Sequence, residues 1–146
     1  MRSKLTVQLQ GEDPTPNIGY PFAQELLRRN QPFTALFAYN DNSAIGAIRA
    51  FEEAGWRVPR DVSVVGLDDI QSAAYINPPL TTVRQPLTKM GEIAALTLLD
   101  RIEKRVKYVP EITVEPELVV RGSAAPSPSD HSGWRDHAEV CHGTNC

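Results

Sequence analysis

The chain has 146 residues, of which 41% are hydrophobic and 23% charged, a composition ordinary for a globular domain with its own core. Its net charge of -3 argues against a basic surface for nucleic acid or an anionic membrane. The first residues contain no apolar segment typical of a secretory signal, and no apolar run approaches the length of a membrane span. The two cysteines, Cys141 and Cys146, form no disulfide framework in a folded region. We therefore expect a soluble, cytoplasmic protein.

The first part of the chain predicts a strand, a helix and a second strand. Apolar and polar residues alternate over residues 5–9, which is typical of a half-buried strand. Over residues 20–30 apolar residues recur at helical spacing, and two arginines occupy the last turn, where cations suit the helix dipole. Residues 34–39 form a continuous apolar run, as in a parallel strand that helices cover on both faces.

A polar break and a second helix follow. The apolar run stops at Asn40-Asp41-Asn42-Ser43, and residues 44–54 then show one broad apolar helical face. Gly55 is suited to end this helix in the left-handed conformation, and Trp56 is available for the accompanying contact.

The second part of the chain continues the alternation. Residues 62–67 predict a buried strand that ends at Asp68-Asp69, and residues 80–83 a short third strand that ends at Arg84-Gln85. A helix from about residue 87 to 104 is expected next, with Pro86 compatible with its first turn. Its apolar stripe is Leu87, Met90, Ala94, Leu98 and Ile102.

The last predicted strand covers residues 112–120, and because Pro116 falls within it, it is expected at an edge or with a bulge. Strands that alternate with helices predict an α/β fold with a mostly parallel sheet and flanking helices. We place the folded domain at residues 1–123 and a disordered tail at residues 124–146, where Ser, Pro, His and Gly replace the periodic pattern.

Three predicted strands thus end in polar side chains, at Asn40-Asp41, Asp68-Asp69 and Arg84-Gln85. Ligands of open α/β sheets bind at the carboxyl ends of the strands, so these residues predict a site for a polar ligand. Each pair also has a structural interpretation. Asp41 or Asn42 could cap the following helix, Asp69 could cap a short helix after it, and Arg84 could form a surface or hinge salt bridge.

The segments "AYNDNSAIGAIRAFEEAGWRVPRDVSVVGLDD", "INPPLTTVRQPLTKMGEIAALTLLDRI" and "PELVVRGS" resemble the C-terminal part of the LacI/GalR family of bacterial transcription regulators. The resemblance covers roughly residues 5–123. It implies part of the C-terminal subdomain of a periplasmic-binding-protein-like (type I) effector domain, without the helix-turn-helix head. It further implies sensing of a small-molecule effector, most often a sugar, and operator DNA binding only through the missing head.

The resemblance also implies roles for individual residues. Asp68 would contact the effector, and Asn40 and Gln85 would face the cleft, with Asp41 beside them. Leu87 stands where some members place an aromatic residue against the ligand. The residues implied at the interface of a homodimer are Ile70, Ala74 and Tyr75, together with the helix that starts near Ser43. Without the N-terminal subdomain, the stripe of the helix at 87–104 is expected to lack its covering surface.

Other functions are less well supported by the sequence. Asp68 and Asp69 would point to opposite faces as neighbours on a strand, and Ser43 has no histidine partner outside the tail, so no enzyme is expected. The His and Cys residues of the tail match no zinc pattern, and neither a metal nor a cofactor is expected. An enzyme on a flavodoxin-like sheet would need a phosphate-binding glycine loop, which "NDNSAIG" does not supply. A periplasmic sugar-binding protein of an ABC transporter remains the alternative, although "VPRDVSVVGLDD" favours the repressor branch.

Overall fold

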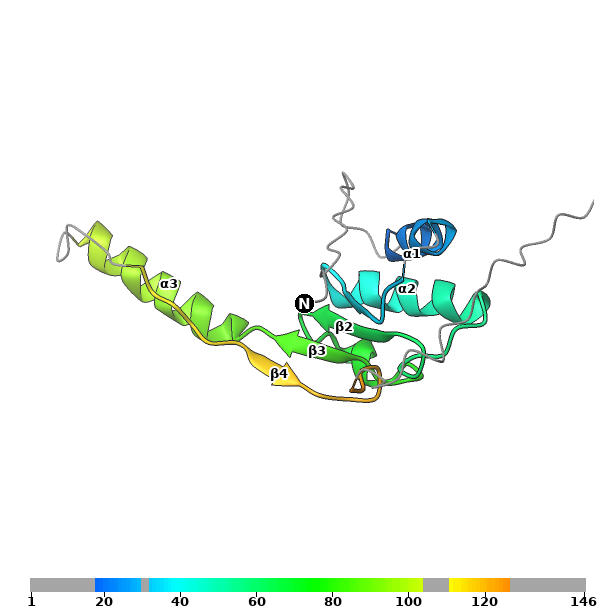
Figure 1. Cartoon of the computed structure of the whole chain (residues 1–146). Coiled ribbons are helices and arrows are strands. Elements are labelled where there is room, and N and C mark those ends of the chain that lie inside the picture. Colours follow the sequence, from blue (N-terminus) through cyan, green and yellow to red (C-terminus); the bar gives the residue numbers. More distant parts are fainter. Residues whose placement is uncertain (1–17, 30–31, 104–110, 127–146) are drawn as a thin grey trace, which may run out of the picture.

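The structure, a computed structural model, describes residues 18–29, 32–103 and 111–126 (Figure 1). The elements in chain order are α1 (Gly19–Arg28), β1 (Ala35–Phe37), α2 (Asp41–Glu53), β2 (Ser63–Leu67), the short 3-10 helix η1 (Gln71–Ala74), β3 (Thr81–Arg84), α3 (Leu87–Ile102) and β4 (Glu117–Val119). The strand predicted at residues 5–9 lies outside the described residues.

The four described strands form one sheet in the order β1-β2-β3-β4. Neighbours among the first three are parallel, whereas β4 runs antiparallel to β3. The predicted α/β fold with a mostly parallel sheet is confirmed. Strand β4 lies at the edge of the described sheet, as predicted. It is shorter than the predicted strand at 112–120 and begins directly after Pro116, which has no N–H to donate to the ladder.

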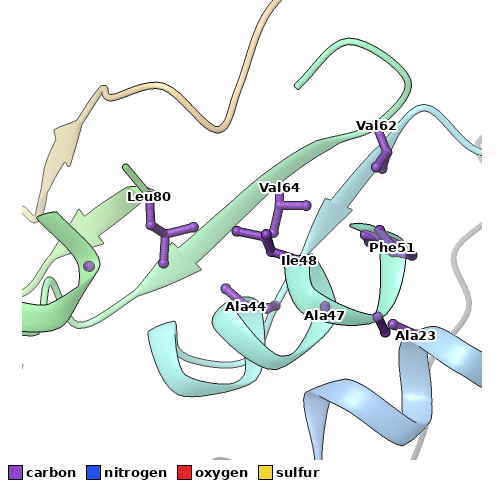
Figure 2. Packing of buried hydrophobic residues seen from close by; sticks show 11 residues of the cluster. Ala23, Ala44, Ala47, Ile48, Phe51, Val62, Val64 and Leu80 are labelled. Atoms are coloured by element: carbon purple, nitrogen blue, oxygen red, sulfur yellow. The ribbon is translucent and has the colours of Figure 1, made fainter. Parts of the chain in front are cut away.

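The core lies between α2 and the sheet (Figure 2). Ala44 and Ala47 are small enough for α2 to lie close to the strands. The larger side chains of Ile48 and Phe51 are buried in the same core. Val64 of β2 contributes to the same core, together with Val62 and Leu80, which immediately precede β2 and β3. Helix α1 packs on α2 through buried Ala23, so the layers are α1, α2 and the sheet (Figures 1 and 2).

Helix α2 ends as the sequence predicts. Gly55 adopts φ +79°, its N–H donates to the carbonyl of Glu52 over 2.9 Å, and the N–H of Trp56 donates to the carbonyl of Phe51 over 2.9 Å. This pair of bonds is the Schellman cap. The Trp56 ring stacks on Phe51 and on Phe33, with centroids 5.9 and 5.3 Å apart, so the helix end is anchored in the core.

The prediction that both faces of the strand at 34–39 are covered is wrong. Phe37 is 65% exposed and Tyr39 75% exposed, although Ala38 is buried. In β2 burial alternates, with Val64 and Gly66 buried and the residues between them half-buried. Helix α2 therefore covers one face of the described sheet, and β1 lies at its edge. Leu36 packs partly against the core, whereas Phe37 gains little burial.

Helix α3 projects away from the sheet (Figure 1), and none of its 16 residues is buried. Its exposed apolar side chains include Leu87, Leu98 and Ile102 of the predicted stripe. The expectation that this stripe lacks a covering surface is confirmed for the described chain. Within the described residues, no helix has both the length and the apolar character needed to cross a bilayer.

The end of the described chain is tied to the sheet by Ser123, which is fully buried. Its Oγ donates to the carbonyl of Val64 over 2.6 Å and accepts from the N–H of Thr81 over 2.8 Å, which links β2 and β3. Ala125 exchanges two hydrogen bonds of 3.1 Å with the Ser63 hydroxyl. The chain is thus still attached at the second residue of the predicted tail, and residues 127–146 lie outside the described residues.

Candidate functional site

The carboxyl ends of β1, β2 and β3 lie side by side, because the parallel register pairs Phe37 with Val65 and Leu67 with Val83. The polar residues that follow these strands therefore share one edge of the sheet. Gln85 Nε2 donates to Asp68 Oδ1 over 2.8 Å, so two of the predicted site residues are in direct contact. Both side chains are half-buried.

Asn40 caps α2. Its backbone is extended (φ -154°, ψ 175°), and its Oδ1 accepts from the N–H of Ser43 over 2.9 Å. The prediction of Asp41 or Asn42 as the cap is wrong, because the helix already begins at Asp41 and the extended residue before it has the capping geometry. The cap fixes the orientation of the Asn40 amide and leaves its Nδ2 as the donor group.

Asp41 is fully buried at the start of α2. Its Oδ2 accepts from the N–H of Ile70 over 2.8 Å, and its Oδ1 accepts from the hydroxyl of Thr82. Gly66 makes this approach possible, because a Cβ at that position would collide with Asp41 Oδ1. Asp41 thus ties α2 to the loop after β2 and to β3, and it belongs to the framework of the site.

Asp68 and Asp69 both have positive φ, at 108° and 55°. Aspartate tolerates the left-handed region better than most residues, but backbone in such sparsely populated regions still costs about 1–3 kcal/mol per residue. The two carboxylates bind different partners. Asp68 contacts Gln85, whereas Asp69 forms ion pairs with Arg84 and Arg121. They do not form a convergent acid/base pair.

The carboxylate of Asp69 lies between two arginines. Arg84 Nε and Arg121 Nη2 each approach one of its oxygens to 2.6 Å. Burial favours a higher pKa for Asp69, but the hydrogen bonds and charges of Arg121 and Arg84 outweigh it and hold the pKa below its ordinary value. The prediction that Asp69 caps a short helix is wrong, since η1 follows Ile70 and has no side-chain cap. The salt-bridge interpretation of Arg84 is confirmed.

The remaining predicted residues lie near this edge or on the surface beside it. Leu87 is the first residue of α3 and is exposed, and its N–H donates to the carbonyl of Gln85 over 2.9 Å. Ala74 and Tyr75, at the end of η1, are exposed, whereas Ile70 packs against the core. Among residues 18–29, 32–103 and 111–126, no three His, Cys, Asp or Glu side chains gather as a metal site.

Sequence reasoning missed Thr82 and Arg121, which organise this edge of the sheet. Thr82 lies 41 residues from its partner Asp41, and Arg121 lies 52 residues from Asp69. Arg121 also donates through Nη1 to the carbonyl of Leu80 over 2.8 Å. Both residues stand in the sequence, in the segments "LTTVRQP" and "VVRGS", but their partners are distant in the chain. Thr82 meets Asp41 because the start of α2 lies against β3, and Arg121 is brought near Asp69 by the pairing of β3 with β4.

A family model described as a periplasmic binding protein-like domain matches residues 5–124. The chain belongs to this family. Its relatives place it on the LacI/GalR branch. It is 43% identical over 130 residues to the HTH-type transcriptional repressor PurR of Proteus mirabilis, a match that covers 86% of this chain and 38% of the relative. The relatives are repressors, and the alternative of a transporter's sugar-binding protein is not favoured.

Two solved structures extend the comparison. The LacI family regulator of Enterococcus faecium with bound ribose is 38% identical, with a TM-score of 0.68, over 79% of this chain and 42% of that chain. The lac repressor dimer bound to operator and the anti-inducer ONPF is 32% identical, with a TM-score of 0.68, over 73% of this chain and 37% of that chain. The present chain therefore spans well under half the length of the proteins it matches.

Proposed function

We propose that this chain is the effector-sensing and dimerisation portion of a LacI/GalR-type transcriptional regulator, and that its effector is a small polar molecule of the sugar class. The observation that carries the proposal is the contact between Asp68 and Gln85 at the shared carboxyl edge of β2 and β3, one strand from Asn40. The proposed role is binding without catalysis. Its setting is the cytoplasm, where a DNA-binding regulator meets its operator.

The proposed site has the chemistry that hydroxyl groups require. The Asp68 carboxylate accepts hydrogen bonds, and such charge-assisted bonds contribute about 1.5–3 kcal/mol each. The amide of Gln85 supplies both a donor and an acceptor, and Asn40 Nδ2 supplies a further donor. Leu87 would offer an apolar edge to a sugar ring. Asp41 is left out of the ligand contacts, because both of its oxygens already accept from the protein.

The described chain supplies one wall of such a site. Small-molecule sites normally enclose most of the ligand surface. In the family resemblance the second wall comes from the other subdomain, and the exposed stripe of α3 fits a surface that this subdomain would cover. We therefore expect the chain alone to bind its effector far more weakly than a two-subdomain protein.

The direct test is the titration of Asp68→Asn with D-ribose, followed by a panel of monosaccharides. Asparagine tolerates positive φ, so this change removes the charge while retaining the backbone that alanine would strain. We expect at least tenfold weaker binding in a two-subdomain parent, with Asp100→Asn on α3 as the matched control. Equal affinity of Asp68→Asn and the unchanged protein would remove Asp68 from the site.

We further propose that Tyr75 and Ala74 contact a second subunit, with Ile70 supporting them from the core side. Both lie exposed at the end of η1, and the structurally similar lac repressor is a dimer. Tyr75→Glu should weaken self-association in sedimentation equilibrium, whereas Tyr39→Glu, which changes a similarly exposed tyrosine, should not. A monomer at every concentration before any substitution would contradict this assignment.

Operator DNA is proposed to bind only through a head domain. The chain has a net charge of -3, which opposes the neutralisation of phosphates on which DNA affinity depends. A gel shift at low salt should show no retardation of operator DNA by this chain. Sequence-specific retardation would contradict the assignment.

A further inference from the structure

Four charged residues form a connected cluster at the base of α3, which we call the crossover cluster. Its members are Asp69, Arg84, Glu117 and Arg121. Arg84 pairs with Asp69 and, through Nη1, with Glu117 Oε2 at 3.0 Å, and Arg121 pairs with the other oxygen of Asp69. No member belongs to the proposed ligand contacts, but Asp69 is the direct neighbour of Asp68.

The cluster stands where the chain leaves the sheet for α3 and where it returns. Arg84 is the last residue of β3, and α3 begins at Leu87. Glu117 is the first residue of β4, the strand that follows α3 (Figure 1). The register also sets Arg84 opposite Glu117. The pair of Arg84 and Glu117 therefore joins the two connections to α3, and the pair of Arg84 and Asp69 joins them to the end of β2.

The same contacts hold a strained turn in place. Residues at positive φ persist where their surroundings determine them from several sides. Here Arg84 and Arg121 hold the Asp69 side chain, and Asp41 Oδ2 holds the N–H of Ile70 immediately after it. On the other side, the N–H of Asp68 donates to the carbonyl of Val83 over 2.9 Å. The backbone of Asp68, at φ 108°, is thus fixed before and after the residue.

Among the ion pairs of the cluster, the pair of Arg121 with Asp69 is the least exposed and is expected to stabilise the fold most. Exposed ion pairs contribute little because water screens them, and Arg84 and Glu117 are 48% and 66% exposed. Asp69 and Arg121 are only 9% and 18% exposed, and Arg121 has two further bonds, to the carbonyl of Leu80 and to the Thr81 hydroxyl through its own N–H. Arg121, held by several bonds, can therefore orient Asp69. Arg84 links Asp69 to the two segments next to α3, since it precedes Leu87 and pairs with Glu117.

We propose that Arg121 and Arg84 act as positioning residues for the effector site: through Asp69 they hold the Asp68 carboxylate beside Gln85, and they couple that position to the two connections of α3. The effector contact by Asp68 is taken from the proposed function above. A shift of α3 that alters the cluster would change effector affinity, and effector binding would change the preferred orientation of α3. The coupling free energy is the same in both directions.

The test begins without ligand, on the whole 146-residue chain, with Arg121→Met, which keeps the aliphatic stem but removes the charged head. We expect the amide shifts and couplings of residues 68 and 69 to change in NMR spectra, and the change to extend to residues 85–87 and 117–119. The matched control is Arg49→Met, which breaks an exposed arginine pair with Glu53 on α2. Wild-type signals at residues 68 and 69 in folded Arg121→Met would overturn the proposal, whether or not any sugar binds.

Two further variants keep the outcome decisive. Asp69→Asn tolerates the positive φ and removes the charge that both arginines bind, so it should reproduce the spectral changes of Arg121→Met even if that variant unfolds. If the NMR changes in Asp69→Asn were confined to residues 68–70, the coupling to α3 would be overturned. In the arm with D-ribose, which uses the two-subdomain parent, Arg121→Met should bind at least fivefold more weakly and Arg121→Lys should recover part of the affinity, whereas unchanged affinity would overturn the positioning role. If the unchanged protein does not bind D-ribose, the proposed effector class is wrong for this sugar. The NMR comparison without ligand then still decides whether Arg121 positions Asp68.

Discussion

Helices α2 and α3 both show an apolar helical face in the sequence, but their burial in the structure differs completely. Seven of the 13 residues of α2 are buried, among them Ala44, Ile48 and Phe51, and none of the 16 residues of α3 is. The apolar residues of α2 alternate between small and large and fit a sheet that the same chain provides. Most of the large apolar residues of α3, among them Leu96 and Leu99 beside the predicted stripe, are exposed. An apolar helical face predicts a covered surface, but the cover need not come from the same segment of chain.

The largest effect that separates these regions is expected from side-chain truncation. Phe51→Ala removes a fully buried ring that stacks on Trp56, and such truncations lower the free energy of unfolding by about 3–5 kcal/mol. Leu98→Ala on exposed α3 should change it by less than about 0.5 kcal/mol. Urea unfolding followed by circular dichroism measures both, and a comparable loss in the two variants would remove the distinction between the regions.

Replacing a glycine by alanine should lower stability beside α2 and raise helix stability in α3. A Cβ at Gly66 would collide with Asp41 Oδ1 and lie 3.0 Å from Leu80, so Gly66→Ala should destabilise the fold by about 1–3 kcal/mol. A Cβ at Gly91, inside α3, would meet nothing within 4 Å, and alanine there favours the helix by up to about 1 kcal/mol. The denaturation midpoint of Gly66→Ala and the helical signal of Gly91→Ala measure the two effects. A stabilised Gly66→Ala would show that α2 does not approach β2 as described.

Loss of the α2 cap should have a smaller effect. Asn40→Ala removes the bond to the Ser43 N–H and should lower the free energy of unfolding by about 1 kcal/mol. The corresponding position of α3 is Pro86, which has no side-chain cap, so Pro86→Ala loses no such bond. Thermal unfolding of the two variants, with Asn40→Asp as the variant that retains a cap, compares the helix starts directly. A midpoint for Asn40→Ala equal to that of the unchanged chain would be the contrary result.

Acid should selectively weaken the edge of the sheet that carries the crossover cluster. The pKa of Asp69 is lower in the folded chain than its ordinary value of 3.8, so its ion pairs stabilise the fold above that value. This contribution is lost as the pH falls through the folded pKa. The difference in stability between the unchanged chain and Asp69→Asn should therefore be constant near neutral pH and shrink below about pH 4. A difference that stays constant down to pH 2 would show that Asp69 is not held by the arginines.

The sequence was sufficient wherever a local pattern determines the structure. The periodicity of residues 44–54, the left-handed Gly55 and the exposed stripe of α3 were all predicted correctly, since each depends on neighbours within about one or two helical turns. The ends of β2 and β3 were also located correctly to about one residue, whereas β1 ends at Phe37, before the predicted end at Tyr39. The roles of the polar strand ends in ligand binding stay predictions.

The parts that could not be predicted depend on contacts between distant segments. Asp41 looked like a ligand residue or a cap, but Thr82 and Ile70 reach it across the fold and enclose it. The exposure of Phe37 depends on whether another element covers the second face of the sheet, which the pattern of a single strand cannot show. The positive φ of Asp68 likewise occurs beside partners that are distant in the chain, the carbonyl of Val83 and the amide of Gln85.

The central claim is that residues 18–29, 32–85 and 117–125 form a folded α/β unit that carries the strand-end site, whereas α3 lacks its partner surface. Amide hydrogen exchange of the monodisperse chain tests it most directly. The amides of β2, such as Val64 and Val65, should exchange only through global unfolding, because they lie in the centre of the sheet. The amides of α3 from Gly91 to Ile102 should exchange far faster, like those of an isolated helix. Equal protection of α3 and β2 in a monomer would contradict the account, since it would show that this chain covers α3 by itself.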